Sequence, residues 1–240
     1  MTNHAANPVR SDRPGFGELK PFNPLKVIVF DCDGVLFDSK EANIRFYTHV
    51  MERVTGPPVR PEHYEFIHMH PVSESLRYLL DDDERLRAAV SYCQGIDFRE
   101  FHAYLRCEPG LLELLELAKS SFNTAVATNR TISARDVLVY FDIDKYFDLV
   151  VSASDVEHPK PHPAAMHKIQ DAFGARAEEI LFVGDSSVDE ALAMATGVYF
   201  AAYKNTGLRA HIHVSHFNEL HPVLNGNPYA ILRAEAALPS

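Results

Sequence analysis

Short apolar segments recur along this chain and alternate with segments whose apolar residues have helical spacing. The short segments are the length of strands, and we expect five buried strands at Val27–Phe30, Thr124–Ala127, Leu149–Val151, Ile180–Val183 and Val198–Ala202. Strands that alternate with helices favour a parallel sheet with right-handed crossovers. In open sheets of this kind, ligands bind beyond the carboxyl ends of the strands. The pattern therefore predicts an α/β fold with its functional site at that edge.

The alternation is interrupted once, by a long insert between the first and second strands. From about Ser39 to Arg106 no strand pattern is evident, and helical segments are separated by prolines, an acidic run and a glycine. We expect these helices at Glu41–Val54, Ser73–Leu80, Glu84–Tyr92 and Phe98–Leu105. A segment of this size can form a small helical bundle. It is either a lid that closes over a substrate or a purely structural subdomain.

The first strand ends directly in two carboxylates, in the order Asp31-Cys32-Asp33-Gly34. Side chains alternate along a strand, so Asp31 and Asp33 leave on the same side and Cys32 turns to the other, towards the core. Two acids this close repel each other and stay ionised together only if a cation or strong donors compensate them. Taken alone, the pair is explained better as a solvated Asp-Gly turn.

Three further strand ends carry polar residues of functional type. Thr128 and Asn129 follow the second strand, Lys160 stands between two prolines after the third, and Asp185 and Asp189 follow the fourth. Each has a simpler explanation by itself: a turn hydroxyl, a solvated lysine or a helix cap. Because the carboxyl ends of parallel strands meet at one edge of the sheet, we expect all of them to converge with the first pair of acids.

Composition limits the partners of the chain. Its 240 residues carry a formal charge of −10, which argues against binding a nucleic-acid backbone or an anionic membrane. An acidic protein that binds an anion needs a local metal, lysine or set of N–H groups. The three cysteines show no CxxC spacing, which favours a reduced, cytoplasmic setting. No segment is long and apolar enough for a bilayer, and residues 1–24 are expected to form a mobile arm.

Four motifs in this order resemble the haloacid dehalogenase (HAD) superfamily, in the branch with a helical C1-type cap. They are DCDGVLFDS with Asp31, ATNR with Thr128, HPKPHP with Lys160, and GDSSVDE with Asp185 and Asp189. The resemblance implies a Rossmann-like core formed by residues 25–38 and 107–220, a cap formed by residues 39–106, and a C-terminal extension at 221–240. Phosphoglycolate phosphatases are the members that the chain resembles most.

The resemblance also implies an activity, the hydrolysis of a small phosphate monoester. Asp31 would be the nucleophile that forms an aspartyl-phosphate, and Asp33 would be the general acid and then the general base. Thr128 and Lys160, with Asn129 beside them, would bind the phosphoryl group. The implied partner is a small phosphorylated metabolite, with no nucleic acid and no membrane.

The implied cofactor is Mg²⁺, which screens the repulsion between a carboxylate nucleophile and a phosphate. By resemblance its ligands are the Asp31 carboxylate, the Asp33 main-chain carbonyl and the Asp185 carboxylate. Asp189 would either reach the waters of the metal or orient Lys160.

Other reactions of the superfamily fit the sequence less well. Dehalogenases lack the second acid, which is present here as Asp33, and phosphonate-cleaving members use a cap lysine, whereas no lysine lies between Glu41 and Arg106. Sugar phosphomutases carry a histidine at the cap hinge, where this chain has Asn43. A phosphomutase and a catalytically silent binding or regulatory member remain the alternatives to a phosphatase.

Two groups of histidines are further candidates. His68 and His70 lie in a segment expected to be a loop that dips from the cap towards the site, and their imidazoles would bind a polar end of the substrate or simply pack on the surface. The cluster His211, His213 and His216 resembles a zinc site in its spacing but has no cysteine pair and lies away from the motifs. Neither group identifies the substrate, and the oligomeric state is not determined by the sequence.

Overall fold

A computed structural model describes residues 25–131 and 133–225 of the chain. Its core is a six-stranded sheet in the order β5-β4-β1-β6-β7-β8, in which every neighbouring pair is parallel. The predicted α/β fold with a parallel sheet is therefore confirmed. The strands are β1 (Val27–Phe30), β4 (Asn123–Ala127), β5 (Leu149–Val151), β6 (Ile180–Gly184), β7 (Tyr199–Tyr203) and β8 (Ile212–Val214).

Each expected strand is present to within a residue or so of its predicted bounds, and within the six-stranded sheet β8 is the strand that the pattern did not predict. The strand β8 is only three residues long and has a histidine at its centre, so it lacks the apolar run that marks the others. Ile212 and Val214 are nevertheless buried, because β8 pairs with β7 at the edge of the sheet.

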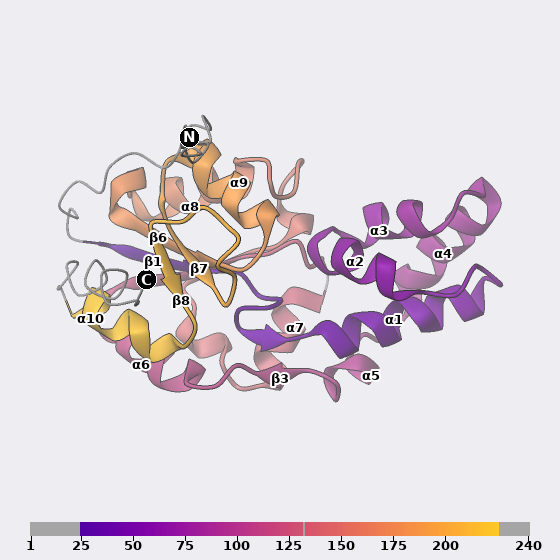
Figure 1. Ribbon diagram of the computed structural model, residues 1–240, viewed down its shortest axis with the longest axis horizontal. Coiled ribbons are helices and arrows are strands. Elements are labelled where there is room, and N and C mark those ends of the chain that lie inside the picture. The colour runs from indigo at the N-terminus through magenta and orange to yellow at the C-terminus, as the bar shows by residue number, and fades with distance from the viewer. Residues whose placement is uncertain (1–24, 132, 226–240) are drawn as a thin grey trace, which may run out of the picture.

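Helices cover both faces of the sheet because its strands are apolar on both faces. Ile28 and Phe30 of β1 pack on the side of α6 (Leu111–Ser121), α7 (Ser133–Tyr140) and α10 (His221–Leu224), whereas Val27 and Val29 pack towards α8 (Ala164–Phe173) and α9 (Ser187–Thr196). Figure 1 shows α8 and α9 on one side of the sheet and α6 and α10 on the other. This alternation continues past the strand end, and Cys32 is buried in the α6 face as expected.

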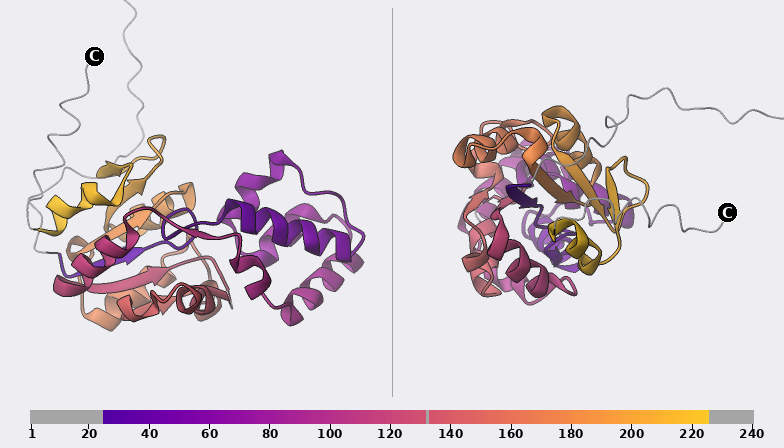
Figure 2. Two further views of the ribbon diagram at one scale, coloured as in Figure 1. Left: turned by 90° about the horizontal axis from the view of Figure 1, so that it is seen from below. Right: turned by 90° about the vertical axis from the view of Figure 1, so that its left-hand side faces the viewer.

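The insert forms a helical body beside the sheet, with an apolar cluster of its own. Figure 1 and the left view of Figure 2 show it extending away from the strands at one end of the core. Its helices are α1 (Lys40–Arg53), α2 (Tyr64–Met69), α3 (Val72–Leu79), α4 (Asp83–Gly95) and α5 (Arg99–His102). The two chain segments that connect it to the core pair side by side as an antiparallel ribbon of β2 (Phe37–Asp38) and β3 (Arg106–Cys107).

Two local expectations for the insert were wrong. His68 and Met69 were expected in a loop, but they form the last turn of α2, a helix of six residues between Pro61 and Pro71 that buries Ile67. A helix of six residues is too short to show helical periodicity in the sequence. It is stabilised by its packing. The helix expected over Phe98–Leu105 is limited to Arg99–His102.

The remaining elements are short. In the described residues, 3-10 turns occur at Pro61–His63, Asp144–Tyr146, Ala153–Asp155, Ala177–Glu179 and Phe217–Leu220. Within the same residues no helix has both the length and the apolar character needed to cross a bilayer. The arm expected at residues 1–24, and the extension expected at 221–240 apart from its first five residues, lie outside the described residues.

Candidate active site

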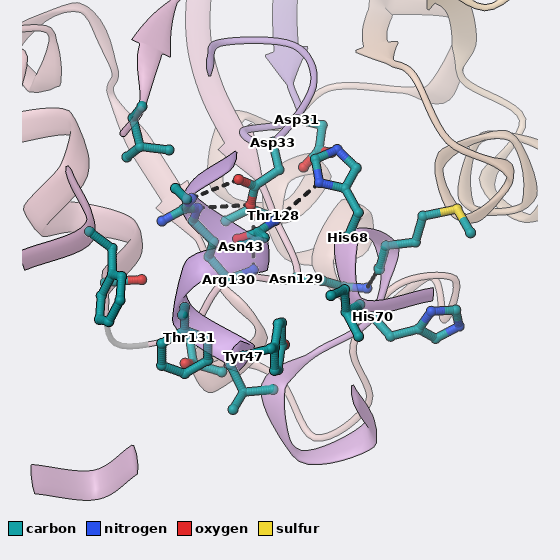
Figure 3. Close-up of a pocket in the computed structure, with 18 of the residues that line it drawn as sticks. Asp31, Asp33, Asn43, Tyr47, His68, His70, Thr128, Asn129, Arg130 and Thr131 are labelled. Carbon is teal, nitrogen blue, oxygen red and sulfur yellow. Dashed lines mark hydrogen bonds and ion pairs between the residues drawn. The ribbon is translucent and has the colours of Figure 1, made fainter. Parts of the chain in front are cut away.

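The predicted site residues meet at the carboxyl edge of the sheet. Asp31, Thr128 and Asp185 are the first residues after β1, β4 and β6, which are neighbours in the sheet, and Lys160 enters from the segment after β5. Together with residues of the helical insert they line one cavity, shown in Figure 3. The fold therefore brings together side chains that are more than 150 residues apart in the chain, such as Asp31 and Asp185.

Lys160 lies at the centre of a buried ion-pair network. Its Nζ lies 2.8 Å from Oδ1 of Asp31 and 2.7 Å from Oδ1 of Asp189, and its side chain is 3% exposed. The other carboxylate oxygen of Asp189 accepts hydrogen bonds from the main-chain N–H (3.1 Å) and the hydroxyl (2.6 Å) of Ser186. Burial alone would lower the pKa of Lys160, but the two carboxylates raise it above its usual value, so the ammonium stays charged.

Asn129 holds the main chain of Lys160 in place. Its Oδ1 accepts from the Lys160 N–H at 2.9 Å, and its Nδ2 donates to the Lys160 carbonyl at 3.0 Å and to the Met69 carbonyl at 3.1 Å. The same amide thus positions the lysine and ties the last residue of α2 to the core. These contacts favour a positioning role for Asn129, which was expected to bind the substrate.

Asp33 is paired with Arg130, a residue to which the sequence had assigned no role. The Arg130 Nε and Nη2 donate to the two Asp33 oxygens at 2.8 and 2.7 Å, and both side chains are about 14% exposed or less. Burial would raise the pKa of Asp33, but the charge and hydrogen bonds of Arg130 outweigh it and lower that pKa below its usual range. The only signal in the sequence was the place of Arg130 directly after Thr128 and Asn129.

The ionised forms of Asp31 and Asp185 are disfavoured, because both carboxyl groups are at least partly buried among other acids. Burial and the charge of Asp189 raise the pKa of Asp31 to about 7 although Lys160 opposes this, and burial with Asp189 and Asp31 raises the pKa of Asp185 well above its usual value. One oxygen from each of these three acids lies within 4.8 Å of the others. A cluster of hard oxygen donors with excess negative charge fits a divalent cation such as Mg²⁺.

Gly34 allows the Asp185 carboxylate to approach the turn after β1. Its φ is +81°, and a Cβ added there would lie 2.1 Å from Oδ2 of Asp185. We expect Gly34→Ala to displace that carboxylate and to strain the turn, lowering the free energy of unfolding by roughly 1–3 kcal/mol and turnover by at least about tenfold. Urea unfolding and phosphate-release assays measure the two effects.

Gly95→Ala is the matched control, because an added Cβ at Gly95 meets no atom within 4 Å. Turnover equal to wild type in Gly34→Ala would show that this close approach is not needed for the site.

The insert supplies the opposite wall of the cavity, and the two predicted histidines differ there. His68 approaches the core acids, and its Nδ1 accepts from the Asn43 amide at 3.0 Å, as Figure 3 shows. His70 also lines the cavity, but its ring stacks on Phe66 at 3.8 Å and its Nδ1 donates to the Phe66 carbonyl at 3.0 Å. Of the two, His68 is the one oriented towards the strand ends.

The three histidines near the C-terminus do not share ligand geometry. Nδ1 of His211 accepts from the main-chain N–H of Phe200 at 3.0 Å, and Nε2 of His213 donates to the Leu208 carbonyl at 2.9 Å. Across residues 25–131 and 133–225, the group of side chains arranged to hold a metal is Asp31, Asp185 and Asp189.

A parallel sheet with acids and a buried lysine at its carboxyl edge, covered by a helical insert, defines a class of hydrolytic α/β enzymes. Residues 28–203 match the profile of the haloacid dehalogenase-like hydrolase family, and the chain belongs to that family. The superfamily predicted from the four motifs is therefore confirmed.

Relatives of the chain include a pyrophosphatase and a phosphoglycolate phosphatase. The chain is 30% identical over 168 residues to pyrophosphatase PpaX of Halalkalibacterium halodurans, covering 69% of this chain and 77% of that protein. It is 44% identical over 85 residues to a phosphoglycolate phosphatase of Photorhabdus laumondii, covering 35% and 36% of the two chains. A crystal structure of a HAD-superfamily hydrolase, subfamily IA, from Geobacter sulfurreducens is 38% identical, with a TM-score of 0.69 and coverage of 83% and 96%. The protein is thus a HAD-family enzyme of the phosphatase or pyrophosphatase type.

Proposed function

We propose that the protein is a Mg²⁺-dependent phosphatase that hydrolyses a small phosphate monoester through an aspartyl-phosphate on Asp31. The observation that carries the proposal is the buried Lys160 ammonium, 2.8 Å from Asp31 and 2.7 Å from Asp189, at the strand edge where Asp185 also lies. This arrangement supports the proposal, because the carboxylate that we propose as the nucleophile lies beside a fixed cation and a set of oxygen donors suited to a metal. A small phosphorylated metabolite is the partner that such a site would take.

In the first step the second carboxylate oxygen of Asp31 attacks phosphorus, because Oδ1 is held by Lys160. The bond from Asp31 to phosphorus forms as the bond to the leaving oxygen breaks, and Asp33 supplies the proton that the leaving alkoxide needs. In the second step Asp33 takes a proton from a water molecule, whose oxygen attacks phosphorus and restores Asp31. Asp33 therefore enters the first step protonated and leaves it as a carboxylate, and the pair with Arg130 stabilises that carboxylate, which is the base of the second step.

Thr128 and Lys160 are suited to hold the transferred phosphoryl group. The Thr128 Oγ1 accepts from the main-chain N–H of Arg130 at 3.0 Å, so its own hydrogen remains to be donated to a phosphoryl oxygen. The Lys160 ammonium supports the negative charge of the other oxygens. We assign Asn129 to the positioning of Lys160 rather than to direct contact with the phosphate.

The residues that would hold Mg²⁺ are Asp31, Asp185 and the main-chain carbonyl of Asp33. When bound, the ion would neutralise charge between the carboxylates and the phosphate. Both oxygens of Asp189 are already engaged with Lys160 and Ser186, which supports orientation of the lysine as the role of Asp189.

The proposal is tested by phosphate release from a panel of monoesters, with inorganic pyrophosphate and phosphoglycolate included. We expect EDTA to abolish release and Mg²⁺ to restore it. In Asp185→Asn the Mg²⁺ concentration for half-maximal rate is expected to rise by about 10- to 100-fold, because a negative ligand is lost. Asp171→Asn, an exposed carboxylate on α8, is the control. Full turnover in EDTA would overturn the metal-dependent mechanism.

A further inference from the structure

His102 is a buried histidine of the active-site cavity that the proposed chemistry does not use. Its residue is 1% exposed, and neither Nδ1 nor Nε2 has a hydrogen-bond partner among the described residues. It lies on α5 and lines the same cavity as Asp31 and Arg130, with its ring 5.1 Å from that of Tyr140 on α7. Buried polar groups without partners are rare in native proteins and point to a ligand or an ordered water.

Apolar side chains share this wall of the cavity with His102. Phe98, Phe101 and Leu105 line the cavity on the same segment. The ring of Phe46 on α1 packs against both phenylalanines, with its centroid 5.3 Å from that of Phe98 and 5.5 Å from that of Phe101. We call Phe46, Phe98, Phe101, His102 and Leu105 the α5 wall. Burial lowers the pKa of His102, so near neutral pH its ring is uncharged and offers one donor and one acceptor.

The positively charged side chains that line the cavity are paired with carboxylates at the strand ends. Of the described residues that line it, the lysine and arginine side chains are Lys160, paired with Asp31 and Asp189, and Arg130, paired with Asp33. A second anionic group placed at the α5 wall would therefore face aromatic rings and a neutral imidazole. Such a group would be desolvated without compensation, which is unfavourable. A hydroxyl group, which both donates and accepts, complements the imidazole instead.

We propose that the α5 wall selects the leaving group of the substrate, with His102 hydrogen-bonding a hydroxyl on a neutral organic alcohol. The substrate class is then the phosphate monoester of an uncharged alcohol that carries a further hydroxyl, in preference to inorganic pyrophosphate or an ester with a carboxylate. This inference rests on the proposed phosphatase function and makes His102 a specificity-determining residue.

The test compares matched pairs of substrates that differ in one hydroxyl. Hydroxyalkyl phosphates of several chain lengths are each paired with the alkyl phosphate of the same length, and inorganic pyrophosphate and phosphoglycolate are assayed beside them. We expect wild-type kcat/KM to favour the hydroxyalkyl phosphate by about tenfold at the best length, the value of one hydrogen bond. Pyrophosphate and phosphoglycolate are expected to react more slowly than that substrate.

His102→Phe keeps a ring of similar size and removes both nitrogens. We expect it to lower kcat/KM for the hydroxyalkyl phosphate by about tenfold relative to the alkyl phosphate of the same length, which abolishes the preference for the hydroxyl. His102→Gln, which retains a donor and an acceptor, is expected to recover part of the preference. His167→Phe, at an exposed position on α8, is the matched control.

Thermal unfolding separates this role from a structural one. Because His102→Phe removes buried atoms that lack partners, its Tm is expected to equal or exceed that of wild type. A lower Tm with a uniform loss of activity on every substrate would assign His102 to structure and overturn the inference. A hydroxyl preference that persists in His102→Phe, or faster wild-type turnover of pyrophosphate than of any hydroxyalkyl phosphate, would overturn it as well.

A binding experiment keeps the test independent of turnover. In the Asp31→Asn variant with Mg²⁺, titration calorimetry with the same substrate pairs should show about tenfold tighter binding of the hydroxyalkyl phosphate, lost when His102→Phe is added. If wild type hydrolyses nothing in the panel but this difference in Kd is present, the proposed function fails and the inference about His102 stands. Equal Kd values within each pair would reject the inference itself.

Discussion

Replacing Asp31 with asparagine is expected to abolish phosphate release, with kcat reduced by roughly a thousandfold or more. The substitution keeps the size and shape of the side chain but removes the anionic oxygen that would attack phosphorus. It also removes the negative charge that faces the Lys160 ammonium at 2.8 Å. Steady-state phosphate release in saturating Mg²⁺ measures the effect.

The control for this experiment is Asp142→Asn. Asp142 is a surface residue that pairs with Lys145 at 2.6 Å and has a φ of 57°, a conformation that asparagine tolerates well. We expect its kcat to match that of wild type. Circular dichroism should show that both variants are folded. Full activity in folded Asp31→Asn would exclude Asp31 as the nucleophile and with it the aspartyl-phosphate.

The second large effect is expected from Lys160→Met, which removes the cation between two buried carboxylates. Asp31 and Asp189 would then face each other without compensation, and we expect the free energy of unfolding to fall by about 3–5 kcal/mol. Turnover should fall by roughly a hundredfold or more, because the phosphoryl oxygens lose their charge partner. Urea unfolding in EDTA measures the stability, and phosphate release measures the activity.

Two further measurements test whether the effect arises from the ion pairs of Lys160 with Asp31 and Asp189. Repeating the unfolding of Lys160→Met in Mg²⁺ should recover part of the lost stability, since a cation bound by the acids replaces some of the missing charge. Lys168→Met, an exposed lysine on α8, should stay within about 0.5 kcal/mol of wild type. A free energy of unfolding for Lys160→Met within about 1 kcal/mol of wild type would contradict a stabilising role for the ammonium.

The sheet and the convergence of the motifs were predictable because they depend on local patterns. The Val27–Phe30 segment is apolar on both faces, so it had to be a central strand, and parallel order brings Asp31 to the same edge as Thr128 and Asp185. Elements too short to show periodicity were not predictable, as β8 and α2 illustrate. Their residues take these conformations because β7 and the apolar cluster of the insert stabilise them.

The sequence by itself determined the fold, the family and the set of side chains gathered at the carboxyl edge. The tertiary structure decided how those side chains are paired. Arg130 holds Asp33 and Asn129 holds the main chain of Lys160, and both partnerships depend on distances between strands that lie far apart in the chain. It also decided that both nitrogens of His102 are buried without a hydrogen-bond partner among residues 25–131 and 133–225. The type of a residue determines which hydrogen bonds and charges its side chain can form. Its burial and its neighbours, which set the energies of those interactions, arise only in the folded molecule.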